Sequence, residues 1–303
     1  MAEIPTLIAY RKRQDRVFQL VGLLCTLIGL ATLAALLIKL AISGAPVLMH
    51  SNFLTRNASY LPGKAGILFA LVGSLCVMLV TFTAAVPLGI AAAIYLEEYA
   101  RKNWLTSLIE INISNLAGVP SITYGLMSLW IFMYLLGLSS SVLVGGLTLA
   151  LLVLPIIIVT TREAIRGIPR AIREAAYACG ATKWQTIRYH LLPYSLGGIA
   201  TGTIIAMSRA VGESAPLIVI GAAGWVSSLP PSPLAARFPF LNLRWLQSDF
   251  TVLPIQMFTW SGDPDPRFQN NAAAAGLVLI AFTLTMNAIA IVVRYRVRRK
   301  IHW

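Results

Sequence analysis

The 303-residue sequence contains little charge, and negative charge least of all. Charged residues make up only 12% of the chain, and 24 Lys and Arg accompany just 11 Asp and Glu. Hydrophobic residues make up 57% of it, and several apolar runs exceed the roughly 20 residues that a helix needs to cross a bilayer. Soluble proteins of this length do not carry such runs. The composition therefore indicates an integral membrane protein.

Histidine and cysteine are also scarce, with three of each. Their positions are scattered: His50, His190 and His302, and Cys25, Cys76 and Cys179. This pattern excludes a histidine cluster, a metal-ligand spacing and a disulfide framework, and the sequence shows no carboxylate pair or nucleophile constellation that would indicate a membrane enzyme. The phosphate-binding sequence G-x-x-x-x-G-K-[ST] is missing too, because the nearest fragment, Gly63-Lys64, lacks the rest. We expect no catalytic residue and no metal site, and any ATP-driven process then needs a separate ATPase chain.

The apolar runs predict an all-α membrane protein with about six transmembrane helices. The predicted spans are Val17–Ile42, Gly66–Leu96, Ile113–Leu136, Leu138–Thr160, Tyr194–Gly221 and Asn271–Val293. The first run has a basic leader like that of a signal peptide, but about 26 apolar residues exceed a typical signal core. We therefore expect this run to stay as a membrane helix.

Lysine and arginine gather on one side of the predicted spans. Seventeen of the 24 lie in the amino terminus, in the loop after the second span, in segment 161–193 and in the carboxyl-terminal tail, whereas five lie in the opposite loops. Because loops rich in Lys and Arg stay in the cytoplasm, both termini should be cytoplasmic. A nucleic-acid-binding protein would gather these residues on one folded surface, so we expect contacts with lipid headgroups and no nucleic-acid partner.

These features divide the chain into four parts. We expect a cytoplasmic amino terminus at 1–16, a first span with its external loop at 17–65, a core of five spans at 66–293 and a cytoplasmic tail at 294–303. The core contains a long cytoplasmic loop at 161–193 and a long external loop at 224–270. The external loop carries prolines, Trp245 and Trp260, and it fits either an aromatic cap at the membrane interface or a docking surface for an extracytoplasmic protein.

The cytoplasmic loop predicts two short helices joined by a glycine turn. Apolar residues recur at helical spacing in its first half: Ile168, Ile172, Ala175, Ala176 and Cys179. Gly180 suits the position just past a helix end, and Thr182 with Gln185 forms a capping-box pattern for a second helix. On pattern alone the loop fits a membrane-surface helix or, because its apolar face is short and rich in alanine, a docking element for another protein.

Small residues form a stripe in the third predicted span. Its members are Ser114, Gly118, Ser121, Gly125 and Ser128, with Tyr124 at the edge. Such stripes usually serve close helix packing in lipid, and a share in a substrate path is the alternative.

The fifth predicted span places two charges, Arg209 and Glu213, inside the membrane. They share one helix arc with other small and polar residues: Thr201, Gly202, Ser208 and Gly212. Each charge near the bilayer centre costs roughly 2.5–3.5 kcal/mol, whereas a pair four residues apart returns only about 0.2–0.5 kcal/mol on a helix in water. The arc should therefore face protein or a wet cavity, where a guanidinium can bind an oxyanion. Pro216 lacks an N–H, so it should leave the carbonyl of Gly212 without its helical partner.

Two sets of motifs carry a resemblance to known families. Glu174-Ala175-Ala176, Gly180 and Leu192-Pro193 resemble the EAA motif of ATP-binding-cassette importer permeases, with His190 as a departure from the usual aliphatic residue. The segments SRAVGESAPL (208–217), LAGVPSITYGL (116–126) and FTVLPIQMFTW (250–260) are similar to signatures of phosphate-importer permeases. The resemblance covers roughly half the chain and implies the type I importer permease fold.

The resemblance also implies roles and partners. The EAA residues would contact a homodimeric ATPase that binds ATP and Mg²⁺, and Arg209 and Glu213 would take part in phosphate passage. We add Ser121, Tyr124 and Ser208 as residues of the substrate path. A related permease and an extracytoplasmic phosphate-binding protein would complete the importer. The alternatives are a permease for sulfate, molybdate or phosphonate, and a self-sufficient secondary transporter or channel that filters anions with Arg209.

Overall fold

The computed structural model describes residues 3–49, 52–222, 224–232 and 242–299, and the secondary structure in these ranges is helical, with no strand. Five of the helices there are long and apolar enough to cross a membrane. They are α1 (Glu3–Met49), α2 (Leu68–Ile94), α5 (Val142–Arg166), α8 (Leu192–Gly212) and α11 (Arg267–Arg299). α2 continues through a π-helical turn, η2 (Tyr95–Tyr99), and a second π-helical turn, η4 (Ile187–Leu191), leads into α8. The predicted all-α membrane architecture is confirmed.

The third predicted span, Ile113–Leu136, is not one straight helix. It divides into α3 (Trp104–Leu116) and α4 (Ser121–Ser128), which continues as η3 (Leu129–Leu135), and the two parts are bent by 111°. Pro120 explains the break, because proline has no N–H and disfavours helical geometry in the residue before it. The prediction of one helix over Ile113–Leu136 was therefore wrong, but with the bent pair taken as one broken span the described residues contain the six predicted spans. The expected stripe of small residues does not lie on one helix face either, because Ser114 and Gly118 precede the bend.

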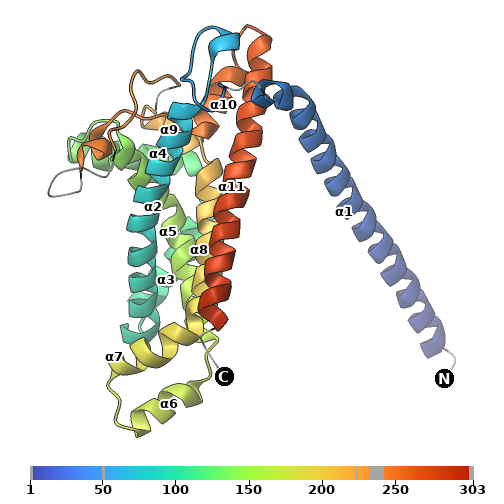
Figure 1. Ribbon diagram of the computed structural model, residues 1–303. Helices are drawn as coiled ribbons and strands as arrows, with labels where there is room; N and C mark the ends of the chain where they lie inside the picture. Colours follow the sequence, from blue (N-terminus) through green and yellow to red (C-terminus); the bar gives the residue numbers. More distant parts are fainter. Residues whose placement is uncertain (1–2, 50–51, 223, 233–241, 300–303) are drawn as a thin grey trace.

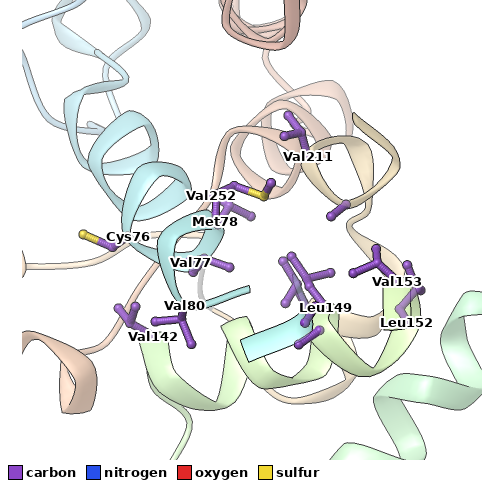
Figure 2. Close-up of a cluster of buried hydrophobic side chains, with 14 of the residues drawn as sticks. Cys76, Val77, Met78, Val80, Val142, Leu149, Leu152, Val153, Val211 and Val252 are labelled. Carbon is purple, nitrogen blue, oxygen red and sulfur yellow. The ribbon is translucent and has the colours of Figure 1, made fainter. Parts of the chain in front are cut away.

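The core lies where α2, α5 and α8 pack together. Figure 2 shows its apolar side chains, which include Val77, Val80, Val142, Leu149 and Val211. Glycines let the backbones approach: Gly146 of α5 lies directly against Val80, and Gly202 of α8 lies against Thr160 of α5. Such close contacts between small residues hold helices together in lipid, where apolar burial alone gives no advantage.

Helix α1 runs away from the other helices. Figure 1 shows it joined to the body only at its carboxyl-terminal end, beside α11. At that crossing Gly44 is required, because a Cβ there would lie 2.7 Å from the backbone nitrogen of Ala274. The apolar residues of α1 before the crossing are exposed, including Phe18, Leu27 and Leu36. The first span therefore contributes little to the core of this chain.

The two ends of the molecule differ. At one end lie α9 (Ala215–Val219), α10 (Leu253–Ser261) and two 3-10 turns, η1 (Pro62–Lys64) and η5 (Arg244–Gln247). At the other end α6 (Arg170–Ala178) and α7 (Lys183–Thr186) project beyond the long helices; α11 ends at this level of the molecule, and α1 starts at the same level but well to the side (Figure 1).

Part of the expected external loop, residues 233–241, lies outside the described residues. Within the rest of the loop, α10 lies against α11 and α2, and Trp245 and Trp260 are buried. Both tryptophans thus act as internal anchors rather than as exposed aromatic groups.

Candidate functional site

A break between α8 and α9 shapes the surroundings of the two intramembrane charges. α8 ends at Gly212, and Glu213 has extended backbone angles, φ −83° and ψ 122°. α9 then starts at Ala215 with Pro216 in its first turn, a position that proline tolerates because the first N–H groups of a helix have no partner inside it. The prediction of one continuous span over Tyr194–Gly221 was therefore wrong. Pro216 starts a second helix instead of lying inside the first.

Arg209 and Glu213 nevertheless form an ion pair. The Nε atom of Arg209 lies 3.6 Å from Oε1 of Glu213, and the two side chains are 38% and 20% exposed. The predicted pairing is confirmed, although the helix no longer continues between the two residues. The distance is longer than a hydrogen bond, so Glu213 holds Arg209 loosely. The guanidinium keeps donors and accessible surface with which it can bind an anion.

Helix α4 packs directly on α9. The bend between α3 and α4 therefore lies close to the break between α8 and α9. A Cβ on Gly125 would lie 2.8 Å from the Cα of Pro216. Tyr124, beside it in the chain, is buried and lies within electrostatic range of Arg209. Its hydroxyl donates to the carbonyl of Leu116 at 2.7 Å, across the break between α3 and α4. The proton of Tyr124 therefore stabilises the bend, and its share in the substrate path stays a prediction. Ser121, the first residue of α4, is half-buried.

Ser208, predicted to belong to the substrate path, contacts helix α11. Its Oγ lies 2.6 Å from Oδ1 of Asn287 on α11 and 2.7 Å from the carbonyl of Ile204. The side chain thus takes part in the contact between α8 and α11. Sequence reasoning missed Asn287, a polar residue within an apolar run, which was the available signal.

The cytoplasmic loop has the predicted two-helix form. Gly180 has φ +82° just past α6, where glycine avoids the strain that a Cβ brings. The capping box is present, with the Thr182 hydroxyl and the Gln185 amide each accepting from the other residue's N–H. Leu192 and Pro193 open α8 and are half-buried.

The faces of α6 differ from the prediction. Ile168 and Ile172 pack inward towards Ile187 and Leu191, and Ala176 is buried as well. The exposed face carries other residues: Ala171, Glu174, Ala175 and Ala178. The predicted apolar face is therefore largely packed against the rest of the chain. The solvent-exposed face consists of small alanine side chains and one carboxylate, that of Glu174.

A network of charges connects this loop to the body, and sequence reasoning missed it. Arg162 of α5 lies 2.6 Å from Glu110 of α3 and 3.5 Å from Glu97 of η2, with its side chain only 8% exposed. Arg166 lies 2.9 Å from the same Glu97, with its own side chain 59% exposed. The Nε and Nη2 atoms of Arg162 lack aligned hydrogen bonds, so its contacts are ion pairs.

Arg173 extends the network to α6. It donates to Glu98 at 3.0 Å and to the backbone carbonyls of Ile165 and Ile168. A cavity of about 680 Å³ opens beside these residues, between α6 and the segment that joins α2 to α3. The signal in the sequence was the position of Glu97, Glu98 and Glu110, because three of only 11 acidic residues lie in one predicted cytoplasmic region or at its edge.

The comparison with known proteins first identifies the class. Residues 85–303 match the family described as binding-protein-dependent transport system inner membrane component. The chain belongs to this family and is a multi-pass permease subunit of an ATP-binding-cassette importer of type I. Such a permease works with a second permease subunit, an ATPase and a substrate-binding protein.

Three individual relatives show which permeases of this family the chain is similar to. The chain is 31% identical over 293 residues to the phosphate transport system permease protein PstA of Yersinia pestis, covering 94% of this chain and 91% of the relative. It is 32% identical over 235 residues to the phosphate transport system permease protein PstA 1 of Mycobacterium tuberculosis H37Rv, covering 78% and 71%. A probable ABC transporter permease protein of Bacillus subtilis, YqgI, is 33% identical over 195 residues, covering 64% and 66%.

Solved structures agree on the fold. A chain of a bacterial alginate ABC transporter superposes with a TM-score of 0.67 at 14% identity, covering 94% of this chain and 96% of that chain. An inward-facing MetNI methionine ABC transporter gives 0.57 at 17% identity, covering 78% and 98%. These identities are low, so the likeness concerns the fold alone.

Proposed function

We propose that this chain is the PstA-type permease of a phosphate importer, which moves inorganic phosphate into the cytoplasm by alternating access. The half-exposed Arg209 carries this proposal. It is a cation within the membrane that its carboxylate partner contacts only at 3.6 Å. An intramembrane charge of this kind is costly and usually functional. The names of the relatives from Yersinia pestis and Mycobacterium tuberculosis support phosphate as the anion.

The site suggests how passage works. Arg209 supplies positive potential and planar donors, which lower the cost of moving an oxyanion out of water. Glu213 orients Arg209 when the path is empty and reduces the net attraction, so that the anion is released. The break between α8 and α9 leaves Glu213 in extended backbone, where its side chain can move without unwinding a helix.

The proposal includes an orientation and a set of partners. Both termini and α6 face the cytoplasm, in agreement with the distribution of Lys and Arg along the chain. The second permease is PstC-type and contributes the other half of the path. A PstB-type ATPase dimer binds ATP and Mg²⁺, and a PstS-type protein delivers phosphate from outside.

Two surfaces fit these partners. The exposed face of α6, with Ala175 and Glu174, is small enough to enter a cleft of the ATPase. The described part of the external loop offers Trp225 to the phosphate-binding protein, since Trp225 is half-exposed and stacks on Tyr60 with 6.3 Å between ring centroids.

Substrate competition tests the proposal. The wild-type chain is reconstituted with its three partner subunits in liposomes, and ATP-driven uptake of labelled phosphate is measured with excess sulfate, molybdate or phosphonate. We expect only unlabelled phosphate to compete strongly. If sulfate, molybdate or phosphonate competes strongly instead, the proposed substrate is that anion and not phosphate. Uptake by this chain without the ATPase would indicate a secondary transporter.

A further inference from the structure

An apolar groove runs between α2, α8 and α11, away from the site described above. Its volume is about 380 Å³, and Arg294 is its one charged lining residue. The rest of the lining is almost wholly apolar and includes Phe82, Val86, Ile90, Leu196 and Ile204. Phe82 and Leu196 are 47% and 38% exposed, so the groove opens to the surroundings of the helices.

The length of the groove fits one leaflet of a bilayer. Phe82 to Ile90 on α2 and Leu196 to Ile204 on α8 each cover eight helical steps, which is about 12 Å at about 1.5 Å per residue. One leaflet contributes about 15 Å of hydrocarbon thickness. Ile90 lies towards the η2 end of α2 and Leu196 near the start of α8, so the groove begins at the end of the molecule that carries α6 (Figure 1).

Arg294 lies at this end of the groove, and a hydrogen bond to α8 orients its guanidinium group. Its Nη1 donates to Oγ1 of Thr201 at 2.6 Å. Unlike Arg162 and Arg209, it has no carboxylate within ion-pair distance among the described residues.

We propose that the groove binds an acyl chain of an anionic phospholipid of the cytoplasmic leaflet, whose headgroup phosphate pairs with Arg294. A guanidinium fork matches a phosphate, and basic pockets between membrane helices on the cytoplasmic side are typical sites for anionic headgroups. The groove supplies the apolar surface for the chain, and Arg294 supplies the complementary charge. The leaflet depends on the orientation given under the proposed function.

Lipid fits this groove better than the partner permease does. Ala200, which lines the groove, and Arg209 are nine residues apart on α8, which at about 100° per residue places them on opposite sides of the helix. A partner that completes the anion path would cover the Arg209 side. The groove side then faces the bilayer.

Native mass spectrometry of the purified full chain tests the proposal. Retention of phosphatidylglycerol is compared with retention of phosphatidylcholine of the same acyl chains. For Arg294→Gln we expect about tenfold weaker phosphatidylglycerol binding, the scale of one lost charge-assisted contact. Ala200→Trp, which fills the groove but keeps the charge, should weaken it similarly. The control is Arg296→Gln, an exposed arginine outside the groove lining, which should bind like the wild type.

Equal retention of the two lipids, or equal retention by Arg294→Gln and Arg296→Gln, would overturn the proposal. A photoreactive residue placed at Ala200 in membranes should label lipid, and labelling of another protein would show that a helix occupies the groove. Added inorganic phosphate should not displace the lipid; displacement would make Arg294 a site for the free anion. None of these measurements uses transport, so a failure here leaves the proposed function standing.

Discussion

Two clusters of charge in this molecule solve different problems. Around Arg162, three arginines of α5 and α6 meet three glutamates of η2 and α3, and the Arg162 side chain is 8% exposed. Around Arg209 there is one carboxylate from the adjoining turn, and the arginine is 38% exposed. A charge that protein partners enclose fixes the positions of helices. A charge that its partner holds loosely is free to meet a ligand.

Magnitudes support this division. Removing one member of a buried ion pair costs about 3–5 kcal/mol, because the remaining charge has no partner, whereas an exposed pair contributes about 0–1 kcal/mol. Because the Arg162 side chain is buried, its ion pairs belong to the strong, buried class. The pair of Arg209 and Glu213 is too exposed and too long for its energy to hold the fold. Variants in the two clusters should therefore fail in different ways.

The largest effect is expected for Arg162→Met. It leaves Glu97 and Glu110 without their buried partner, and we expect the chain to lose about 3 kcal/mol of stability and most of its assembly into complexes. The thermal midpoint of the purified full chain in detergent measures this. Arg166→Met is the matched control, since Arg166 pairs with the same Glu97 but is 59% exposed. Equal loss in the two variants would show that burial does not set the strength of this network.

A bulky side chain on the exposed face of α6 should abolish coupling while leaving the fold intact. Ala175 is exposed, so we expect Ala175→Trp to leave the core of the chain undisturbed but to block entry of the helix into a cleft of the ATPase. We expect transport-linked ATP hydrolysis to fall to the rate of the uncoupled ATPase. Leu284→Trp, at an exposed position on α11, is the control. Normal coupled hydrolysis in Ala175→Trp would place the ATPase elsewhere.

Glu213→Gln should reduce turnover without reducing assembly. The amide keeps the shape of the side chain but removes the charge that tempers Arg209, so phosphate should be released more slowly. We expect uptake to fall severalfold while the thermal midpoint changes little, because the pair is partly exposed. Unchanged uptake would show that Glu213 has no part in release.

The smallest effect is expected for Ser208→Ala. Its hydroxyl contacts Asn287 of α11, so the change should cost about 1 kcal/mol of stability and leave phosphate uptake nearly normal. A loss of uptake comparable to that of Glu213→Gln would return Ser208 to the anion path.

Local patterns in the sequence predicted much of this structure. The capping box at Thr182 and the glycine turn at Gly180 depend on residues a few positions apart, and both are confirmed. The pairing of Arg209 with Glu213 is confirmed for the same reason. The apolar runs predicted the helical membrane architecture but not the breaks in the third and fifth spans. Pro120 was a local signal too, but the segments on both sides of it are largely apolar, so the run was interpreted as one helix and the 111° bend was missed.

Contacts between distant segments were not predictable in this way. Arg173 and Glu98 are 75 residues apart, and Arg162 gave no sign of its partners beyond its positive charge. Trp260 reads as an interfacial residue, and only the packing of α10 against α11 shows that it is internal. The direction of Ser208 likewise depends on where α11 lies.

The central claim is that Arg209 lines the anion path and stabilises the anion within the membrane. Phosphate uptake by Arg209→Gln tests this claim most directly. Complexes of the four components, matched in composition, are reconstituted with the wild type, Arg209→Gln, Arg209→Lys or Arg56→Gln, the last an exposed arginine in the segment between α1 and α2. We expect Arg209→Gln to lose at least about tenfold in uptake, the scale of one charge-assisted contact, and Arg209→Lys to recover only part of it because a point charge lacks the planar fork. Uptake by Arg209→Gln equal to that by Arg56→Gln would contradict the claim and leave Arg209 and Glu213 as a structural pair.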